Sequence, residues 1–288
     1  MTRPQIEFIQ AAALPWRRGL YGRARPDVRS KMLSIDKESG ESSVIVKYPP
    51  GWKRPKKEHL LVDEEIFVLE GSIRIAGIEY ERHCYAHLPA GYERLRQSSK
   101  DGAVVLTFFS GTPRAKPGKA ERGLYKKKRL VKYLDTWNMP WSSSLPDGSE
   151  LDPNLPGIGG MKSLRVDPDN EDFTFLYGTM PQGHPVGWAG KLETHPVVEE
   201  MYLLAGENSG NKGIMRPGAY FWRPPGIEHG PYGTITGCLS FFRTKGGMLV
   251  NNWSRHKVGY TYAPRHRPVL PKELRRYARE TPAAPLGH

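Results

Sequence analysis

The sequence predicts an all-β protein built from two similar halves. Short runs of β-branched and aromatic residues, such as SSVIVKY at 42–48 and AVVLTFF at 103–109, have the length and composition of strands. The 31 glycines and 26 prolines supply the turns that many short strands need. Several short motifs also recur at a nearly constant offset, which indicates a duplication.

The repeat consists of three matched pairs of segments. EEIFVLEG at 64–71 matches EEMYLLAG at 199–206, and LPAGYER at 88–94 matches RPPGIEH at 223–229, both 135 residues later. A third pair, LTFF and LSFF, lies 133 residues apart. Because three separate matches share nearly one spacing, we expect two copies of one domain.

The segments outside the repeat are richer in proline and charge. Residues 113–133 read PRAKPGKAERGLYKKKRLVKY and lack a paired basic and aromatic face that would bind bases, so a solvated linker is expected there. Near the C-terminus, PKELRRYAR at 271–279 has a proline at its start and is the best candidate for a short helix.

Composition limits the partners and the compartment. The chain has 43 Lys and Arg against 30 Asp and Glu, a net charge of +13, which favours anionic partners without choosing among them. Cys84 and Cys238 are too few for a disulfide framework. No signal-peptide pattern and no apolar run of membrane-spanning length is present. We expect a cytoplasmic protein that binds neither nucleic acid nor membrane.

The second half contains a group of residues with the chemistry of metal ligands. Glu193 and His195 lie two residues apart, so on a strand both side chains project from one face. Glu199 opens the next strand, and His229 follows a PPG turn that can bring it in from a distant strand. Two imidazoles with one or two carboxylates suit iron(II), manganese, zinc or nickel and leave positions open for substrate or oxygen. The sequence therefore predicts one divalent ion in this half.

Glycines and a proline around these residues complete two spaced motifs. The first motif has Gly187, Glu193, His195, Glu199 and Gly206, and the second has Gly218, Pro224, Gly226 and His229. In this pattern both halves resemble cupin domains, and the whole chain is similar to a bicupin. Glu193 stands where the cupin motif has its first histidine.

The resemblance implies two tandem cupin barrels, which are double-stranded β-helix or jelly-roll folds. An N-terminal cupin domain is expected over residues 1–115 and a basic linker with a connecting segment over 116–165. A C-terminal cupin domain with its tail is expected over 166–288. Because cupins commonly pair through their sheets, the resemblance also implies a homodimer.

Three roles are open for Glu193. As a fourth ligand it places two carboxylates beside the ion, which makes the site formally neutral and favours a harder ion. Off the metal it acts as a general base. In the third case it forms a salt bridge with Lys191 or an arginine and no ion is bound.

The first half departs from the motif at the ligand positions. Its alignment places Lys57 and His59 at the two histidines of the first motif, Glu64 at the glutamate and Arg94 at the last histidine. Lys57 and Arg94 are cationic at neutral pH and are not ordinary ligands. We expect no metal in this half and a pairing of Glu64 with Lys57 or Arg94, with a retained anion pocket as the alternative.

Four more residues of the second half are candidates for the pocket. His184 is expected as a further ligand or a proton donor, or else as a surface or packing residue. Tyr220 and Trp222 alternate on one strand and so share a face, which either lines a substrate pocket or fills the core. Met201 has the parity of Glu199 and is expected in the apolar wall of the cavity.

These features favour a metal-dependent bicupin enzyme that acts on a small organic substrate, anionic or carbonyl-bearing. A non-haem iron dioxygenase-type reaction in the C-terminal barrel ranks first, with Fe(II) preferred over Mn, Zn or Ni, because carboxylate and histidine ligands with open positions suit oxygen activation. The alternatives are a non-oxidative cupin isomerase or lyase and a non-enzymatic metal-containing ligand sensor.

Overall fold

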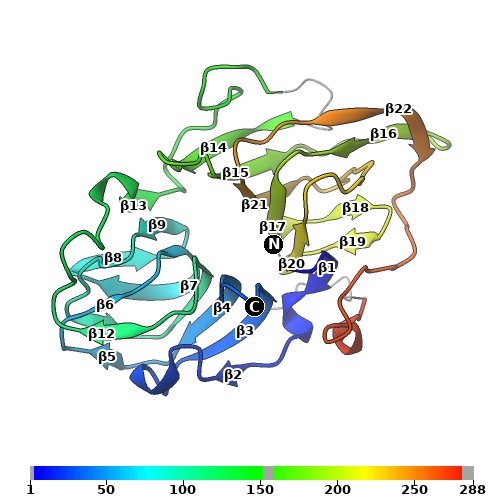
Figure 1. The fold of residues 1–288 in the computed structure, drawn as a ribbon. Coiled ribbons are helices and arrows are strands. Elements are labelled where there is room, and N and C mark those ends of the chain that lie inside the picture. The colour runs from blue at the N-terminus through cyan, green and yellow to red at the C-terminus, as the bar shows by residue number, and fades with distance from the viewer. Residues whose placement is uncertain (1–2, 152–157, 281–288) are drawn as a thin grey trace. The chain divides into compact units, whose positions relative to one another are not determined.

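The computed structural model describes residues 3–151 and 158–280, and within them the protein is all-β (Figure 1). These residues form 22 strands and four short 3-10 helices, and none of them is assigned to an α-helix. No helix in the described ranges is long and apolar enough to cross a membrane. The all-β class predicted from the strand-like runs is confirmed.

The chain forms two compact units. Of the described residues, unit 1 contains residue 3 and residues 14–139, and unit 2 contains residues 4–13 and 140–280. Residues 4–13 thus belong to unit 2, whereas the predicted N-terminal domain began at residue 1. The reason is that β1 (Ile6–Gln10) pairs antiparallel with β20 (Ala219–Arg223).

The main sheet of unit 1 has the strand order β13-β9-β7-β11-β4-β3-β2. Strands β5, β8 and β10 attach to its margin, and β6 pairs with β12. The strands of this unit are β2 (Arg17–Arg18), β3 (Arg29–Ile35), β4 (Ser42–Tyr48), β5 (Trp52–Arg54), β6 (Glu58–Leu60), β7 (Glu64–Ile75), β8 (Ile78–Glu81), β9 (Cys84–Leu88), β10 (Gln97–Ser99), β11 (Ala103–Phe109), β12 (Ala115–Pro117) and β13 (Val131–Asp135), with the 3-10 helices η2 (Gly22–Ala24) and η3 (Lys127–Arg129).

Part of the expected linker is therefore built into unit 1. β12 pairs with β6, and β13 pairs with β9, so strand pairing holds both ends of the basic segment against the unit. Most side chains of residues 113–133 are exposed, as expected of a solvated linker, but strand pairing and not side-chain charge decides the path of the backbone at its ends.

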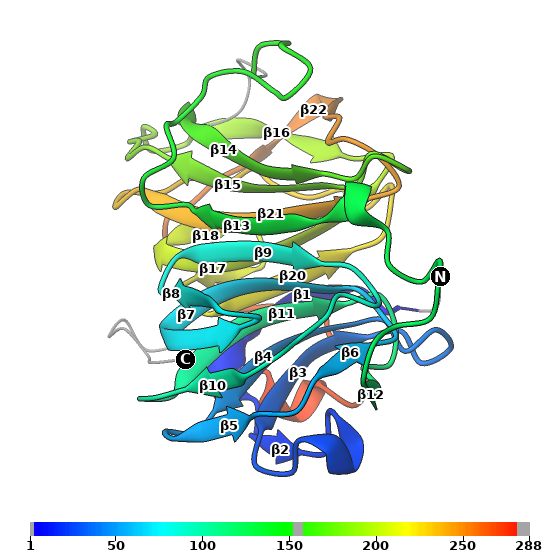
Figure 2. The same cartoon turned by 90° about the vertical axis from the view of Figure 1, so that its left-hand side faces the viewer.

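The main sheet of unit 2 has the order β1-β20-β17-β21-β15-β14, and Figure 2 shows β14, β15, β21 and β17 side by side. Two smaller sheets pair β16 with β22 and β18 with β19. Its remaining elements are β14 (Ile158–Val166), β15 (Phe173–Thr179), β16 (Ala189–Thr194), β17 (Val198–Gly206), β18 (Asn208–Gly210), β19 (Gly213–Met215), β21 (Cys238–Lys245), β22 (Asn252–Gly259) and the 3-10 helices η1 (Ala11–Ala13) and η4 (Arg275–Tyr277). The helix expected over 271–279 is reduced to η4.

The repeated sequence motifs have the same local structure in both units. β7 pairs with β11 and β17 pairs with β21, each with a register shift near one end. Gly71 and Gly206 both have positive φ, +66° and +74°. A Cβ at these positions would lie 2.1 and 2.0 Å from the carbonyl oxygens of Gly102 and Gly237, so only glycine fits.

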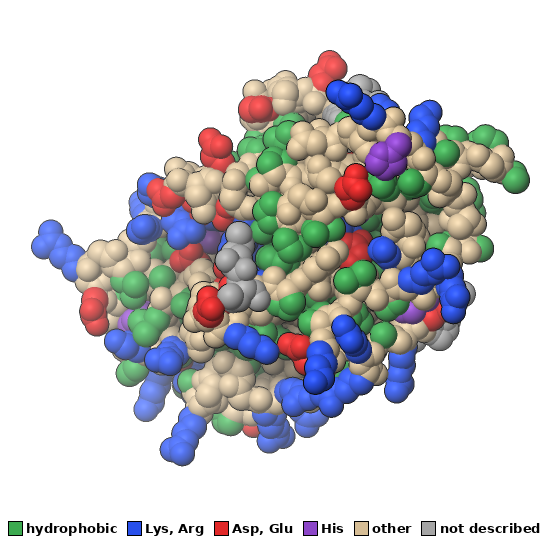
Figure 3. All heavy atoms as spheres, turned by 45° about the vertical axis from the view of Figure 1, so that its right-hand side comes forward, with side chains coloured by type: hydrophobic (Ala, Val, Ile, Leu, Met, Phe, Trp, Pro, Cys, Tyr) green, Lys and Arg blue, Asp and Glu red, His purple; other side chains and the backbone are tan. Residues whose placement is uncertain are grey.

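The interior of unit 1 contains a large apolar cluster, which includes Val44, Val68, Tyr80 and Val105. The described residues of unit 2 include two smaller clusters, one around Met201 and one around Phe175. On the surface drawn in Figure 3, Lys and Arg side chains are numerous and carboxylates lie among them. That face therefore carries both signs of charge despite the net charge of +13.

Candidate metal centre

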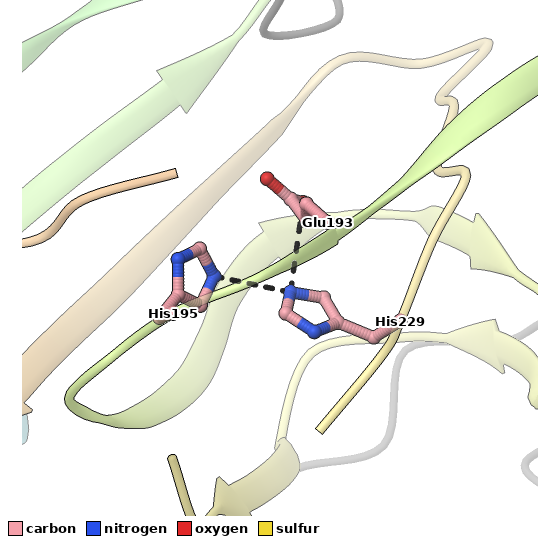
Figure 4. A group of neighbouring side chains, drawn as sticks. All are labelled: Glu193, His195 and His229. Carbon is pink, nitrogen blue, oxygen red and sulfur yellow. Dashed lines mark hydrogen bonds and ion pairs between the residues drawn. The ribbon is translucent and has the colours of Figure 1, made fainter. Parts of the chain in front are cut away.

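Three segments of unit 2 bring the predicted ligands together. Glu193 lies on β16 and His195 directly follows this strand, while Glu199 lies near the start of β17. His229 follows β20 and is joined to Glu193 by two backbone hydrogen bonds of 3.0 and 3.1 Å. Figure 4 shows the side chains of Glu193, His195 and His229 pointing toward one another.

Backbone contacts fix which ring nitrogen of each histidine faces the cluster. His195 Nδ1 lies 2.9 Å from the Val250 carbonyl oxygen, and His229 Nδ1 lies 2.9 Å from the Ile227 carbonyl oxygen. Because a carbonyl only accepts, Nδ1 carries the hydrogen and Nε2 of the neutral ring carries a lone pair. The two Nε2 atoms are 3.1 Å apart. Two lone pairs at this distance repel each other unless a cation lies between them.

The carboxylates converge on the same point. Glu193 Oε1 is 3.6 Å from His229 Nε2, and Glu199 Oε2 is 3.6 Å from His195 Nε2 and 3.5 Å from His229 Nε2. Ligand atoms about 2.1 Å from one octahedral ion lie about 3 Å apart. Glu193, His195 and His229 have ligand atoms within 4.8 Å of one another and form a group that can hold a metal ion.

Glu199 also belongs to a buried ion network that the motif does not show. Arg223 Nη1 donates to Glu199 Oε2 at 2.5 Å. The other nitrogens of Arg223 donate to both carboxylate oxygens of Glu7 and to the hydroxyl oxygen of Tyr232. Glu7 comes from β1, so the N-terminal segment supplies part of this site.

The charges of this network fit a divalent ion. Glu7, Glu193 and Glu199 are three carboxylates, and Arg223 is the guanidinium that pairs with two of them. All four side chains are buried, with relative exposures of 9% or less. Buried charge is costly unless it is neutralised. The two excess negative charges match one divalent cation, and two imidazole ligands favour a transition metal over magnesium or calcium.

Protonation is also suited to metal binding. Burial raises the pKa of Glu199, but Arg223 and the two imidazoles outweigh it and lower this pKa to about 2. Burial, followed by the charge of Arg223, lowers the pKa of His229 to about 3 against the opposing effect of Glu199. At neutral pH the site thus presents an ionised carboxylate and a neutral imidazole, the forms that bind metals.

A cavity of about 390 Å³ in unit 2 opens onto the cluster. Glu193, His195, Glu199 and Arg223 line one part of it, and most of the remaining wall is apolar. The apolar lining residues are Leu145, Leu151, Met161, Phe175, Met201, Met215, Phe221, Phe242, Met248, Leu249 and Val250. A cavity of this size and composition is typical of small-molecule sites.

Of the predicted pocket residues, some line the cavity and others do not. Met201 lines the cavity as expected from its parity with Glu199. Tyr220 and Trp222 are not among the residues that line it, whereas the alternate residues Phe221 and Arg223 of the same strand are. Side chains alternate along a strand, so Tyr220 and Trp222 lie on the other face of β20 and are buried in the core, which was the alternative to the pocket. Tyr220 is instead buried in a hydrogen bond of 2.5 Å to Glu200.

His184 lies in an aromatic cluster and not among the residues that line the cavity. Its ring stacks on Trp188 with centroids 3.7 Å apart, and Tyr260 packs edge-on against it at 5.4 Å. Burial lowers the pKa of His184. This position corresponds to the packing alternative, and a proton-donor role for His184 stays a prediction.

The matching position in unit 1 is filled by protein cations. Arg94 forms a buried ion pair with Glu64, and Lys57 pairs with Glu93 at 2.6 Å instead. The alternative in which Arg94 pairs with Glu64 is therefore the one observed. Among the described residues of unit 1, no group of three potential metal ligands is found.

The structure also corrects the alignment of the two halves by one residue. Glu58 and Arg94 are joined by the same pair of backbone hydrogen bonds, 3.0 and 2.8 Å, as Glu193 and His229. Glu58, not Lys57, is thus the counterpart of Glu193. Its carboxylate pairs with Arg25 at 2.6 Å.

Sequence reasoning missed Glu7, Arg223 and Tyr232. Arg223 carried a partial signal, because it directly precedes the PPG turn of the second motif, but its pairing with Glu199 appears only in the sheet. Glu7 carried none, since only the pairing of β1 with β20 places it beside Arg223.

A family model described as a domain of unknown function (DUF4437) matches residues 13–251, which is more than half of the chain. The chain belongs to this family. No curated protein is similar to it in sequence at a significant level.

Several solved structures share its fold. A protein of Nostoc punctiforme PCC 73102, described as a proposed dioxygenase, aligns with a TM-score of 0.72 and 20% identity over 89% of this chain and 87% of that one. A mutant of Bacillus subtilis oxalate decarboxylase aligns with a TM-score of 0.53 and 12% identity over 86% and 79%. The 7S globulin of Momordica charantia gives 0.53 and 10% over 85% and 86%. At these identities the likeness shows a shared fold.

Proposed function

We propose that this protein is a metal-dependent bicupin enzyme in which unit 2 holds one divalent ion and unit 1 holds none. The ligands are His195, His229 and Glu199, and Glu193 lies beside them as a general base. The observation that carries the proposal is the pair of Nε2 lone pairs 3.1 Å apart, with two carboxylates at 3.5–3.6 Å. A two-barrel architecture is supported by the matched strand pairs β7–β11 and β17–β21.

The reaction we favour is of the non-haem iron dioxygenase type. Bound iron(II) would supply oxygen activation beside a chelated substrate. The name of the Nostoc punctiforme neighbour agrees with this class of reaction. Most of the cavity wall is apolar, and such a wall would strengthen the electrostatic interactions of the reacting groups.

The residues around the ion have separate tasks in this proposal. The Val250 and Ile227 carbonyls hold the two imidazoles in the tautomer that binds a metal. Arg223 holds the carboxylate of Glu199 in place from the side. Glu193 lines the cavity and is the group positioned to accept or return a substrate proton.

A non-oxidative lyase or isomerase is the second candidate. The observation that favours it is the second carboxylate, Glu193, at 3.6 Å from His229 Nε2. Two carboxylate ligands would make the centre neutral and favour a harder ion such as manganese, which polarises a carbonyl without redox chemistry.

Metal analysis of two histidine variants and an oxygen-uptake assay test the proposal. His195→Ala should lose the single ion per chain, whereas His59→Ala should keep it. His59 is a matched control because it is a buried histidine of unit 1 whose Nδ1 also contacts a backbone carbonyl, at 3.1 Å. Oxygen uptake by the iron-loaded protein would be measured with β-diketones, hydroxylated aromatics and keto acids. Equal metal content in the two variants would contradict the proposed metal site. Absence of oxygen uptake by the iron-loaded protein would favour the lyase or isomerase.

A further inference from the structure

The cavity wall of unit 2 is arranged in rows that cross the strands of the main sheet. Residues that pair across antiparallel strands have side chains on the same face, and successive rows on that face are two residues apart. Glu199 pairs with Arg223 on one side and with Thr244 on the other. This charged row forms the metal end of the cavity.

The next row is entirely apolar. Phe242 pairs with Phe175 and with Met201, and Met201 pairs with Phe221, so that four strands contribute one residue each. All four residues line the cavity. Two residues along a strand span about 7 Å, so this row begins about one ring diameter from the charged row.

Aromatic contacts make the second row a rigid surface. The rings of Phe175 and Phe242 stack with centroids 5.2 Å apart and planes inclined by 9°. Phe221 packs against Phe242 at 6.2 Å with an angle of 65°. Phe242 remains partly exposed, whereas Phe175 is only 1% exposed. A flat ring that enters the cavity can thus pack on Phe242 without displacing the stack.

Polar groups return in the third row. Tyr177 pairs with Ser240, and both line the cavity beyond Phe242. Gln182 lines the cavity as well, and its side-chain Nε2 is buried with no hydrogen-bond partner among the described residues. A buried amide donor without a partner costs free energy unless a ligand or water accepts from it.

We infer that the substrate of unit 2 has an oxygen-bearing chelating head, an aromatic ring attached to it, and a hydrogen-bond acceptor on the far side of the ring. The head binds at the charged row, the ring lies on Phe242 and Phe175, and the acceptor meets Gln182. This inference rests on the proposed function, because the head needs the ion.

Binding of hydroxamates to the cobalt(II)-loaded protein tests the inference through the visible spectrum of the ion, without turnover. Acetohydroxamic and benzohydroxamic acids have the same chelating head, and only the second has a ring. We expect benzohydroxamic acid to bind at least tenfold more tightly. Phe242→Leu should lose most of that preference while acetohydroxamic acid binds within twofold of its original affinity, which controls for damage to the metal site.

The distal contact has its own comparison. Replacing benzohydroxamic acid by its 4-hydroxy derivative should raise the affinity about fivefold, and Gln182→Leu should abolish this gain. Equal affinity of the protein for acetohydroxamic and benzohydroxamic acids would overturn the aromatic substrate while leaving the metal proposal intact. Failure to bind cobalt would overturn the proposed function itself, and no gain from the 4-hydroxy group would remove Gln182 from the site.

Discussion

Replacement of Glu7 by glutamine tests whether the N-terminal strand helps to build the metal site. In the structure Glu7 accepts hydrogen bonds from Nε and Nη2 of Arg223, and both residues are buried. A glutamine side chain has one oxygen, so its amide nitrogen would face an N–H group of the guanidinium. Glu199 would then be the carboxylate left to neutralise Arg223.

Two effects of different size follow. Arg223 keeps Glu199 as its counter-ion, so Glu7→Gln removes hydrogen bonds to a charged group, and the free energy of unfolding of the metal-free protein should fall by about 1.5–3 kcal/mol. Arg223 would also bind Glu199 Oε2 more strongly, and this is the oxygen that lies 3.5–3.6 Å from the two Nε2 atoms. Loss of outer contacts to a metal ligand weakens metal affinity by about 10- to 100-fold.

Denaturation in urea measures the first effect, and competition with a chromophoric chelator measures the second. Glu58→Gln is the matched control, since Glu58 pairs with the buried Arg25 of unit 1. The control should lose stability but keep its metal affinity. If Glu7→Gln bound the ion as tightly as the unmodified protein, Glu7 would have no part in the site.

Three further predictions concern the ligands and the buried charges. Glu193→Gln should lower turnover by more than metal content if Glu193 is a base, and lower both together if it is a ligand, as metal analysis beside an activity assay would show. Arg94→Met should cost about 3–5 kcal/mol of unfolding free energy in urea, because Glu64 is left buried without its cation, and should leave metal content unchanged. The metal-free protein should be acid-labile. Glu199 contributes stability that is complete above its unfolded pKa near 4.5 and is lost as the pH falls toward 2. The stability contributed by the neutral form of His229 is lost as the pH falls from about 6.5 to 3. A urea midpoint that stays constant from pH 7 to pH 3 would contradict this last reasoning.

The residues that could be predicted from the sequence are those whose neighbours are set by local spacing. Glu193 and His195 lie two apart on an extended segment, and the motif around His229 includes the turn that returns it to the cluster. The structure brings these three side chains together. The repeat of the two halves could also be recognised in the sequence, because the same turn in both units requires a glycine, Gly71 in one and Gly206 in the other.

Other features depend on pairings that no local pattern reveals. Glu7 reaches Arg223 only through β1, which joins a sheet whose other strands begin some 150 residues later. For Tyr220 and Trp222 the alternation was clear but the inward face was not, since both faces of β20 carry large apolar or aromatic side chains. The choice between faces is made by the neighbouring strands, and the pairing of Glu199 with Arg223 decides it.

The two units solve one electrostatic problem in two ways. Glu58 and Glu64 in unit 1 occupy the places of Glu193 and Glu199 in unit 2, so each unit buries two carboxylates at this position. In unit 1 the buried guanidinium groups of Arg25 and Arg94 supply two positive charges.

In unit 2 the counterpart of Arg94 is His229, whose lowered pKa keeps it neutral, and the charge of Arg223 is cancelled by Glu7. Two positive charges are then missing, and a divalent ion would supply both. A guanidinium is a side chain of the protein and occupies the site itself, and an apolar cluster fills much of the interior of unit 1. An ion held by imidazoles can keep positions open toward the cavity beside it, which is why we place the chemistry in unit 2 and expect a single ion per chain.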